Sequence, residues 1–167
     1  MTERAAGDAA IEALAADLGQ ALLREGLLCA TAESCTGGLV AAAITAIAGS
    51  SGWFDRGFVT YSNESKMELL GVDPLVLTTH GAVSEPTARA MADGALARSR
   101  AQLSVSITGV AGPGGGTAQK PVGMVCLAWA RAGDATRVVT CHFEGDRQTV
   151  RRASVVEALR GLRALVR

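Results

Sequence analysis

Three short polar segments carry the side chains of this chain that could do covalent chemistry. The first reads Thr-Ala-Glu-Ser-Cys-Thr-Gly-Gly over residues 31–38 and follows an apolar run that predicts a buried strand. The hydroxyl of Ser34, at a turn from strand to helix, could attack a carbonyl carbon while nearby backbone N–H groups stabilise the oxyanion. The alternative is an ordinary Ser/Thr helix cap. Gly37 and Gly38 disfavour that alternative, because each costs a helix about 1 kcal/mol relative to alanine, and they indicate that a ligand approaches the backbone.

The second segment reads Tyr-Ser-Asn-Glu-Ser-Lys over residues 61–66. Tyr61 ends a predicted strand and Lys66 follows about one helical turn later, so both side chains could reach one crevice. A lysine that acts as a general base needs a pKa well below its usual value of about 10.4, and burial lowers it. Lys66 and Lys120 are the only lysines among the 16 basic residues. In a chain so rich in arginine, the remaining lysines are expected at positions where arginine cannot substitute. The alternatives are a solvated helix residue for Lys66 and an aromatic at the edge of the core for Tyr61.

The third segment is a glycine-rich stretch after a predicted strand, residues 108–117. Its backbone N–H groups could bind a phosphate or a carboxylate, and a flexible surface loop is the alternative. It lacks the Gly-Lys-Ser/Thr of a P-loop, and Thr117 stands where a Gly-x-Gly-x-x-Gly motif would need its last glycine. The candidate binding residues in it are Gly109, Gly112, Gly114, Gly115, Gly116 and Thr117.

Other catalytic arrangements fit this sequence poorly. The two histidines, His80 and His142, have no metal-ligand spacing, and no Gly-x-Ser-x-Gly elbow is present. A serine hydrolase built on this chain would therefore use lysine, assisted by tyrosine, as its base. The residues predict acyl transfer by Ser34, Tyr61 and Lys66, with no metal and no organic cofactor. Cys35 is a rival nucleophile, since a thiol is intrinsically stronger.

Apolar periodicity and turn residues predict alternating helices and strands, ending in a β-hairpin. We therefore expect an α/β fold, three-layer α/β/α, with a mixed sheet of parallel strands plus the C-terminal hairpin, in a single domain over residues 1–167. The last helix should begin at Asp146 and turn Val155, Val156, Leu159 and Leu162 to the core. The other expected helices span residues 8–25, 35–48, 63–70 and 84–101, and the expected strands span 27–32, 54–61, 103–108, 122–131 and 136–143.

The composition limits the class of protein. Sixteen basic and sixteen acidic residues give a net charge of zero, which argues against a binder of nucleic acid or of anionic membranes. No apolar run reaches the roughly 20 residues of a membrane span, and the N-terminus lacks the pattern of a signal peptide. Four cysteines fit neither a zinc spacing nor a Cys-x-x-Cys pair. They predict free thiols in a reducing cytoplasm.

Together the three segments and two others resemble the CinA C-terminal domain family, whose stand-alone members are nicotinamide-nucleotide amidohydrolases. The resemblance runs from about residue 8 to 165, without the additional N-terminal domain of the larger CinA proteins. It implies the stand-alone enzyme form. The matching stretches are AESCTGG at 32–38, VTYSNESKMELLGV at 59–72, GAVSEPTARAMADGA at 81–95, TGVAGPGGGTAQKPVG at 108–123 and FEGDRQTVR at 143–151.

The resemblance implies hydrolysis of the carboxamide of nicotinamide mononucleotide (NMN), which gives nicotinate mononucleotide and ammonia in pyridine-nucleotide salvage. It implies Ser34 as the nucleophile, activated by Tyr61 and Lys66, and assembly into a homo-oligomer. Arg147 is a candidate partner for the substrate phosphate, with a solvated helix residue as the alternative. Residues expected to bind substrate, besides Arg147 and the glycine-rich stretch, are Glu33, Thr36, Gly37 and Gly38.

A second interpretation comes from a different class. The chain could bind a pyridine nucleotide without hydrolysing it, or act as an accessory module in competence or damage responses. A neutral chain without a basic stripe offers no surface for DNA, and the presence of Ser34, Tyr61 and Lys66 favours an enzyme.

Overall fold

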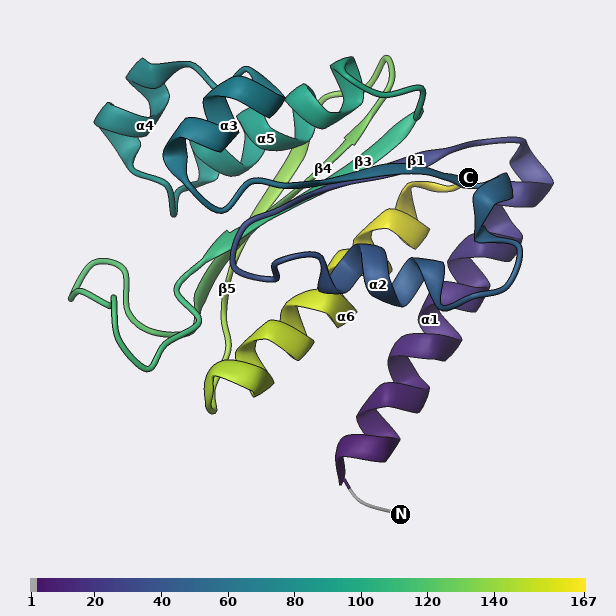
Figure 1. The fold of residues 1–167 in the computed structure, drawn as a ribbon, viewed down its shortest axis with the longest axis horizontal. Helices are drawn as coiled ribbons and strands as arrows, with labels where there is room; N and C mark the ends of the chain where they lie inside the picture. Colours follow the sequence, from purple (N-terminus) through teal and green to yellow (C-terminus); the bar gives the residue numbers. More distant parts are fainter. Residues whose placement is uncertain (1–2) are drawn as a thin grey trace.

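The computed structural model describes residues 3–167, with side chains from residue 7 onwards. Over this part the chain forms one five-stranded sheet flanked by helices (Figure 1). The strands are β1 (Cys29–Glu33), β2 (Phe54–Val59), β3 (Leu103–Gly109), β4 (Met124–Arg131) and β5 (Arg137–His142). The helices are α1 (Glu3–Glu25), α2 (Leu39–Thr45), α3 (Asn63–Leu70), α4 (Pro74–His80), α5 (Glu85–Ala97) and α6 (Arg147–Leu165), with a short 3₁₀ helix at Ser50–Gly52.

The sheet is mixed, as predicted. Its strand order is β2-β1-β3-β4-β5. β1 pairs in parallel with β2 and β3, while β4 pairs antiparallel with β3 and β5. The predicted C-terminal hairpin is therefore confirmed as β4 and β5.

Helices cover both faces of the sheet and give the predicted three layers (Figure 1). α1, α2 and α6 pack against one another on one face, and α3, α4 and α5 lie on the other. β3 shows how alternation serves both layers. Val105 and Ile107 belong to the core that includes α1, α2 and α6, whereas the hydroxyl of buried Ser106 donates to the carbonyl of Ala88 in α5.

Three predicted helices need correction, and a fourth helix was not predicted. The helix expected over 35–48 is shorter, because Gly37 and Gly38 have φ of +57° and +99° and α2 begins only at Leu39. α4 was not predicted, although Asp73 at its N-cap followed by Pro74 is a normal start signal. α5 ends at Ala97 rather than near residue 101. In α6, Val156 is half-buried rather than in the core.

The parallel strands place three chain segments at one edge of the sheet. β1, β2 and β3 end there at Glu33, Val59 and Gly109. The strand order also reverses at β1, which has β2 on one side and β3 on the other. In open α/β sheets, ligands bind outside the carboxyl ends of the strands at such a reversal. Ser34, the residue after β1, stands at that point.

Candidate active site

Ser34 and Lys66 meet in the interior. Nζ of Lys66 lies 3.1 Å from Oγ of Ser34, within hydrogen-bond reach. The same amine donates to the carbonyl oxygens of Thr60 at 2.9 Å and Tyr61 at 3.5 Å. Lys66 is 1% exposed and Ser34 is 9% exposed. The contact joins two residues 32 positions apart, so folding alone assembles this pair.

The surroundings of Lys66 favour its neutral form. α3 begins at Ser62, whose Oγ accepts from the N–H of Ser65, and Lys66 follows on the buried side of the helix. Burial lowers the pKa of Lys66, because a charged ammonium loses its hydration, while the negative charge of Glu64 and, more strongly, any thiolate at Cys35 oppose that shift. Lys66 forms no ion pair with any of the described residues. A lowered pKa increases the uncharged fraction of the amine, and it is the uncharged amine that can accept a proton from the serine hydroxyl.

The turn over residues 34–38 is held by its own backbone. The N–H of Ser34 donates to the carbonyl of Ile107 in β3 at 2.9 Å, and the N–H of Gly37 donates back to the carbonyl of Ser34 at 3.0 Å. Gly37 and Gly38 are needed for their left-handed φ, which other L-residues rarely adopt. This conformational requirement is sufficient to explain the paired glycines, and the approach of a ligand to them stays a prediction.

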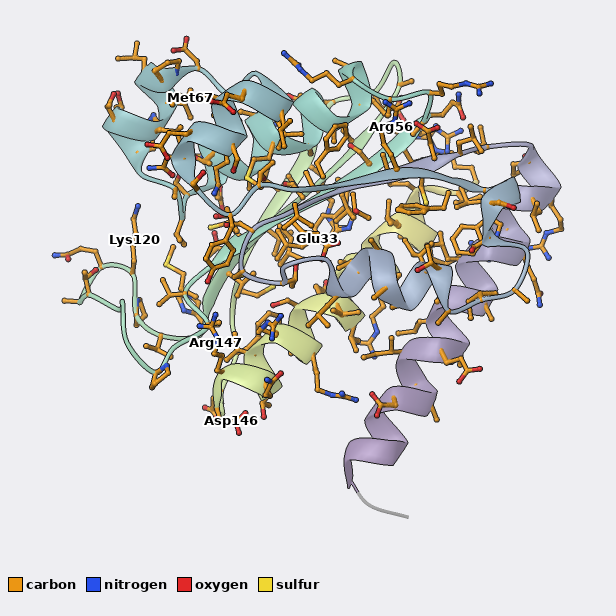
Figure 2. The ribbon with its side chains drawn as sticks, viewed as in Figure 1. Glu33, Arg56, Met67, Lys120, Asp146 and Arg147 are labelled. Carbon is orange, nitrogen blue, oxygen red and sulfur yellow. The ribbon has the colours of Figure 1, made fainter. Side chains whose placement is uncertain are left out.

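Glu33 has a structural role in this turn. The side chain is fully buried, between the sheet and α2 (Figure 2). Its two carboxylate oxygens accept from the N–H groups of Val40 at 2.9 Å and Ala41 at 3.0 Å. Gly38 at the N-cap of α2 offers no side-chain cap, so Glu33 satisfies these N–H groups and places its charge at the positive end of the helix. The structure does not bring Glu33 to a free position facing a substrate.

The hydroxyl of Tyr61 does not contact the Ser34–Lys66 pair. The side chain is 65% exposed, and its hydroxyl accepts from Nη2 of Arg147 at 3.3 Å. The other terminal nitrogen of Arg147 donates to the carbonyl of Gly112 at 2.8 Å. Arg147, the first residue of α6, therefore joins the end of β2 to the start of the glycine-rich loop (Figure 2). Only the backbone carbonyl of Tyr61 contacts Lys66.

The glycine-rich loop after β3 divides into a packed base and an exposed tip. Gly109 belongs to β3, where a Cβ would lie 2.7 Å from Val125, and buried Gly112 has φ of +83°. Residues 113–119 are exposed. Gly114 and Gly115 lie in this tip, together with Gly116 and Thr117. The N–H of Thr117 donates to the carbonyl of Lys120, whose amine in turn donates to the carbonyl of His80.

Two buried hydroxyls beside the pair have no hydrogen-bond partner among the described residues. They belong to Thr36 and Thr60. Thr36 lies two residues after Ser34, and Thr60 carries the carbonyl that accepts from Lys66. A buried hydroxyl without a partner costs about 1–3 kcal/mol. Such groups are expected where a ligand completes the hydrogen bonding.

Cys35 is a poor rival to Ser34. Its side chain is 6% exposed, and burial raises the pKa of its thiol to about 11, outweighing the lowering effect of nearby Arg151. The thiolate, which is the reactive form, is therefore a minor species at neutral pH. All four cysteines are free thiols, as predicted.

Sequence reasoning missed Arg151. Its Nε donates to the carbonyl of Cys35 at 3.1 Å, and its Nη2 donates to the carbonyl of Thr36 at 3.2 Å. Arg147 and Arg151 lie four residues apart on α6, so they share one helix face. That i, i+4 spacing, within the motif at 143–151, was the available signal.

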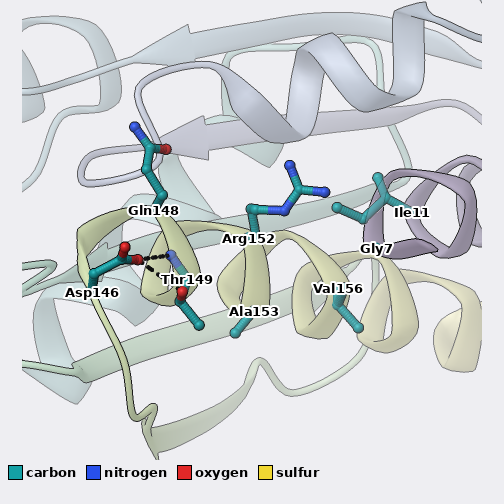
Figure 3. Close-up of a pocket in the computed structure, with 8 residues that line it drawn as sticks. All are labelled: Gly7, Ile11, Asp146, Gln148, Thr149, Arg152, Ala153 and Val156. Atoms are coloured by element: carbon teal, nitrogen blue, oxygen red, sulfur yellow. Dashed lines mark hydrogen bonds between the residues drawn. The ribbon is translucent and has the colours of Figure 1, made fainter. Parts of the chain in front are cut away.

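A cavity of about 610 Å³ lies between α1 and the start of α6, away from this pair (Figure 3). Its lining includes none of the proposed site residues Ser34, Tyr61, Lys66 and Arg147. Its acid Asp146 is occupied in capping α6 through Thr149 (Figure 3). Its base Arg152 is paired with Asp8. The chemistry of the site, rather than the size of a cavity, therefore locates the candidate active site.

Residues 7–167, whose side chains the structure describes, hold no cluster of three or more His, Cys, Asp or Glu side chains suited to a metal ion. None of the helices in the described part of the chain combines the length and apolarity needed to cross a bilayer.

Comparison with known proteins identifies the family. The model of the CinA C-terminal domain matches residues 11–166. The chain belongs to this family. It is 53% identical over 156 residues to Nicotinamide-nucleotide amidohydrolase PncC of Escherichia coli K12, covering 93% of this chain and 94% of that protein. It is also 51% identical to a putative competence-damage inducible protein of Symbiobacterium thermophilum, but covers only 37% of that longer chain.

Solved structures agree with this assignment. A competence/damage inducible protein from Agrobacterium tumefaciens superposes with a TM-score of 0.93 at 50% identity, over 95% of this chain and 96% of the other. A CinA-superfamily protein from Escherichia coli gives 0.88 at 40% identity, over 93% and 90%. The CinA-superfamily α/β architecture predicted from the sequence is confirmed.

Proposed function

We propose that this chain is an amidohydrolase that converts NMN to nicotinate mononucleotide and ammonia. The observation that carries the proposal is the buried contact of 3.1 Å between Nζ of Lys66 and Oγ of Ser34. Support comes from the relative in Escherichia coli, which is named a nicotinamide-nucleotide amidohydrolase and matches nearly the whole chain.

The first half of the reaction forms an acyl-enzyme. Neutral Lys66 takes the proton of Ser34 while Oγ bonds to the carbon of the carboxamide. The carbonyl oxygen becomes an oxyanion, which backbone N–H groups of the turn stabilise. The C–N bond then breaks, Lys66 returns its proton to the leaving nitrogen, and ammonia departs. Lys66 is neutral again and Ser34 carries the ester.

The second half returns the enzyme to its starting state. Lys66 takes a proton from water as the oxygen of the water attacks the ester carbon. The bond to Oγ breaks, Oγ recovers the proton, and nicotinate mononucleotide is released. The carbonyls of Thr60 and Tyr61 hold the amine of Lys66 in place through both halves. Proton transfer through the hydroxyl of Tyr61 stays a prediction, and Tyr61→Phe tests it.

Substrate binding falls to groups around the pair. Arg147 is accessible and already bonds neutral oxygens of Gly112 and Tyr61. A phosphate would be a stronger acceptor for a guanidinium than either. The exposed N–H groups of the glycine-rich loop would add further donors for it. Exposed Tyr61 offers an aromatic face to the positively charged pyridinium ring.

The test is ammonia release from NMN by the purified chain, with no metal added and Ser34→Ala measured in parallel. We expect turnover by the wild type and none by the variant, with NMN binding to both in calorimetry. Binding without turnover by the wild type would instead favour the non-catalytic nucleotide-binding module. Equal turnover by both proteins would remove Ser34 as the nucleophile.

A further inference from the structure

Arg151 hydrogen-bonds the backbone directly after the proposed nucleophile. Its guanidinium reaches from α6 to two successive carbonyl groups, those of Cys35 at 3.1 Å and Thr36 at 3.2 Å. These contacts are partly buried and join segments 116 and 115 residues apart in the chain. Arg151 makes no hydrogen bond to Oγ of Ser34 or Nζ of Lys66, so it acts on the turn and not on the reacting atoms.

These two hydrogen bonds fix the direction of the neighbouring N–H groups. In a planar trans peptide the C=O and the N–H point in opposite directions. The N–H of Thr36 therefore points away from Arg151, because its peptide partner, the carbonyl of Cys35, points toward it. In the same way the N–H of Cys35 points away from the N–H of Gly37, which donates to the carbonyl of Ser34.

Three N–H groups of the turn, those of Cys35, Thr36 and Gly38, remain available as donors, and the first two directly follow Ser34. The N–H of Ser34 is bonded to Ile107, and the N–H groups of Val40 and Ala41 are bonded to Glu33. By contrast, among the described residues the N–H groups of Thr36 and Gly38 make no hydrogen bond, and the N–H of Cys35 contacts only its own sulfur. The buried hydroxyl of Thr36 also lacks a partner in this part of the chain. Unused donors next to a nucleophile are what an oxyanion requires.

We infer that Arg151 is a positioning residue for the oxyanion-binding donors in the attack by Ser34. It fixes the N–H of Thr36 directly, through the carbonyl of Cys35. It fixes the N–H of Cys35 indirectly, because its bond to the carbonyl of Thr36 orients the N–H of Gly37, which bonds the carbonyl of Ser34. The inference rests on the proposed function for its reaction, and the turn geometry supports it independently. The planar guanidinium is suited to this task, because its donors have a fixed arrangement that can bond two carbonyl oxygens at once. A lysine ammonium is a single point charge and lacks this fixed arrangement of donors.

The kinetic test compares Arg151→Ala and Arg151→Lys with Arg163→Ala. Arg163 lies on the same helix and forms an ion pair with Asp17 at 2.8 Å, so its variant controls for the loss of one arginine contact. We expect Arg151→Ala to lower kcat by about 100-fold, since a displacement of catalytic groups by about 1 Å can cost that much. KM for NMN should change little. Arg151→Lys should recover only part of kcat, and added methylguanidinium should partly rescue Arg151→Ala.

A second measurement needs no turnover. Amide hydrogen exchange by ¹⁵N NMR should be faster at Gly37 in Arg151→Ala, because its bond to the carbonyl of Ser34 loses support, and unchanged in Arg163→Ala. Failure of the wild type to hydrolyse NMN, with this change in exchange present, would remove the proposed function and leave the control of the turn by Arg151 standing. An unchanged kcat in an active enzyme, or unchanged exchange at Gly37, would overturn the inference.

Discussion

The turn at residues 34–38 and the loop at residues 110–123 follow neighbouring parallel strands, are both rich in glycine, and yet differ in construction. Ser34, Cys35 and Thr36 are buried, and each of their carbonyls accepts a hydrogen bond. The loop exposes residues 113–119, and its contacts gather at its base and at Lys120.

This difference separates two tasks at one edge of the sheet. Groups that react must be held in place before the substrate arrives, because electrostatic stabilisation depends on preorganised donors. Groups that accommodate a nucleotide can lie on a less restrained segment. We therefore expect substitutions in the turn and in Lys66 to lower kcat, and substitutions around the loop to raise KM.

The largest effect should follow replacement of Lys66. Lys66→Arg keeps a positive charge at every accessible pH and should lower kcat by about 10²–10⁴-fold, the usual contribution of a general base. The wild type should gain kcat/KM as pH rises through the lowered pKa of Lys66, because only the neutral amine accepts a proton. That rise should be complete below about pH 10.4, the pKa of a solvated lysine.

A pH series of ammonia release for the two proteins checks this prediction, with Lys120→Arg as the matched control. Among the described residues Lys120 hydrogen-bonds only to Thr117 in the loop and to the carbonyl of His80 in α4, so its variant should keep the wild-type profile. A flat profile in the wild type would contradict a titrating lysine base.

Arg147 tests the binding side of the comparison. Arg147→Gln removes a charge opposite the substrate phosphate and should raise KM for NMN by about 10-fold, since hydrogen bonds to charged groups contribute about 1.5–3 kcal/mol. The change in kcat should be small. Nicotinamide riboside, which lacks the phosphate, should bind the variant and the wild type equally well. Steady-state kinetics with both compounds measures this, and an equal loss for both would place Arg147 elsewhere in the mechanism.

Gly37 in the turn and Gly114 in the loop form a matched pair that tests how differently the two segments tolerate a side chain. Gly37→Ala forces a side chain into φ of +57° and should cost about 1–2 kcal/mol, with a lower melting temperature and a lower kcat. Gly114→Ala meets no atom within 4 Å and has no left-handed φ. We expect that variant to match the wild type in melting temperature and kcat. Calorimetric scans and kinetics on both variants check the pair, and equal effects would mean that turn and loop are alike.

The smallest effect should follow Cys35→Ala. Because burial raises the pKa of this thiol to about 11, its thiolate is scarce at neutral pH and most of the activity should persist. Ammonia release under the wild-type conditions measures it. A loss as large as that expected for Ser34→Ala would make Cys35 the nucleophile.

Much of this architecture was predictable because its signals are local. α3 ends at Gly71 with φ of +66°, and Asp146 caps α6 through Thr149, both as the sequence indicates. The hairpin and the mixed sheet also follow from apolar patterns and turns. The turn at residues 35–38 escaped prediction, because the run rich in Ala, Leu and Ile that follows it suits a helix, while Gly37 and Gly38 require left-handed φ. Assembly into a homo-oligomer and a cytoplasmic location stay predictions.

The site was only partly predictable, since its contacts link distant segments. Ser34 and Lys66 were selected by residue type, and the structure brings them together. The role of Glu33 as the cap of α2 could not be read from spacing, because Val40 and Ala41 approach it only after the turn has formed. Likewise the contacts of Arg151 depend on how α6 lies against the turn.

The most direct test of the account is to trap the acyl-enzyme. NMN is mixed with the wild type, the reaction is quenched with acid within milliseconds, and the digested protein is measured by mass spectrometry. We predict that the peptide containing Ser34 gains the mass of NMN minus ammonia, with fragmentation placing the ester on Ser34. An adduct on Cys35, or the absence of any adduct together with full turnover by Ser34→Ala, would contradict the account.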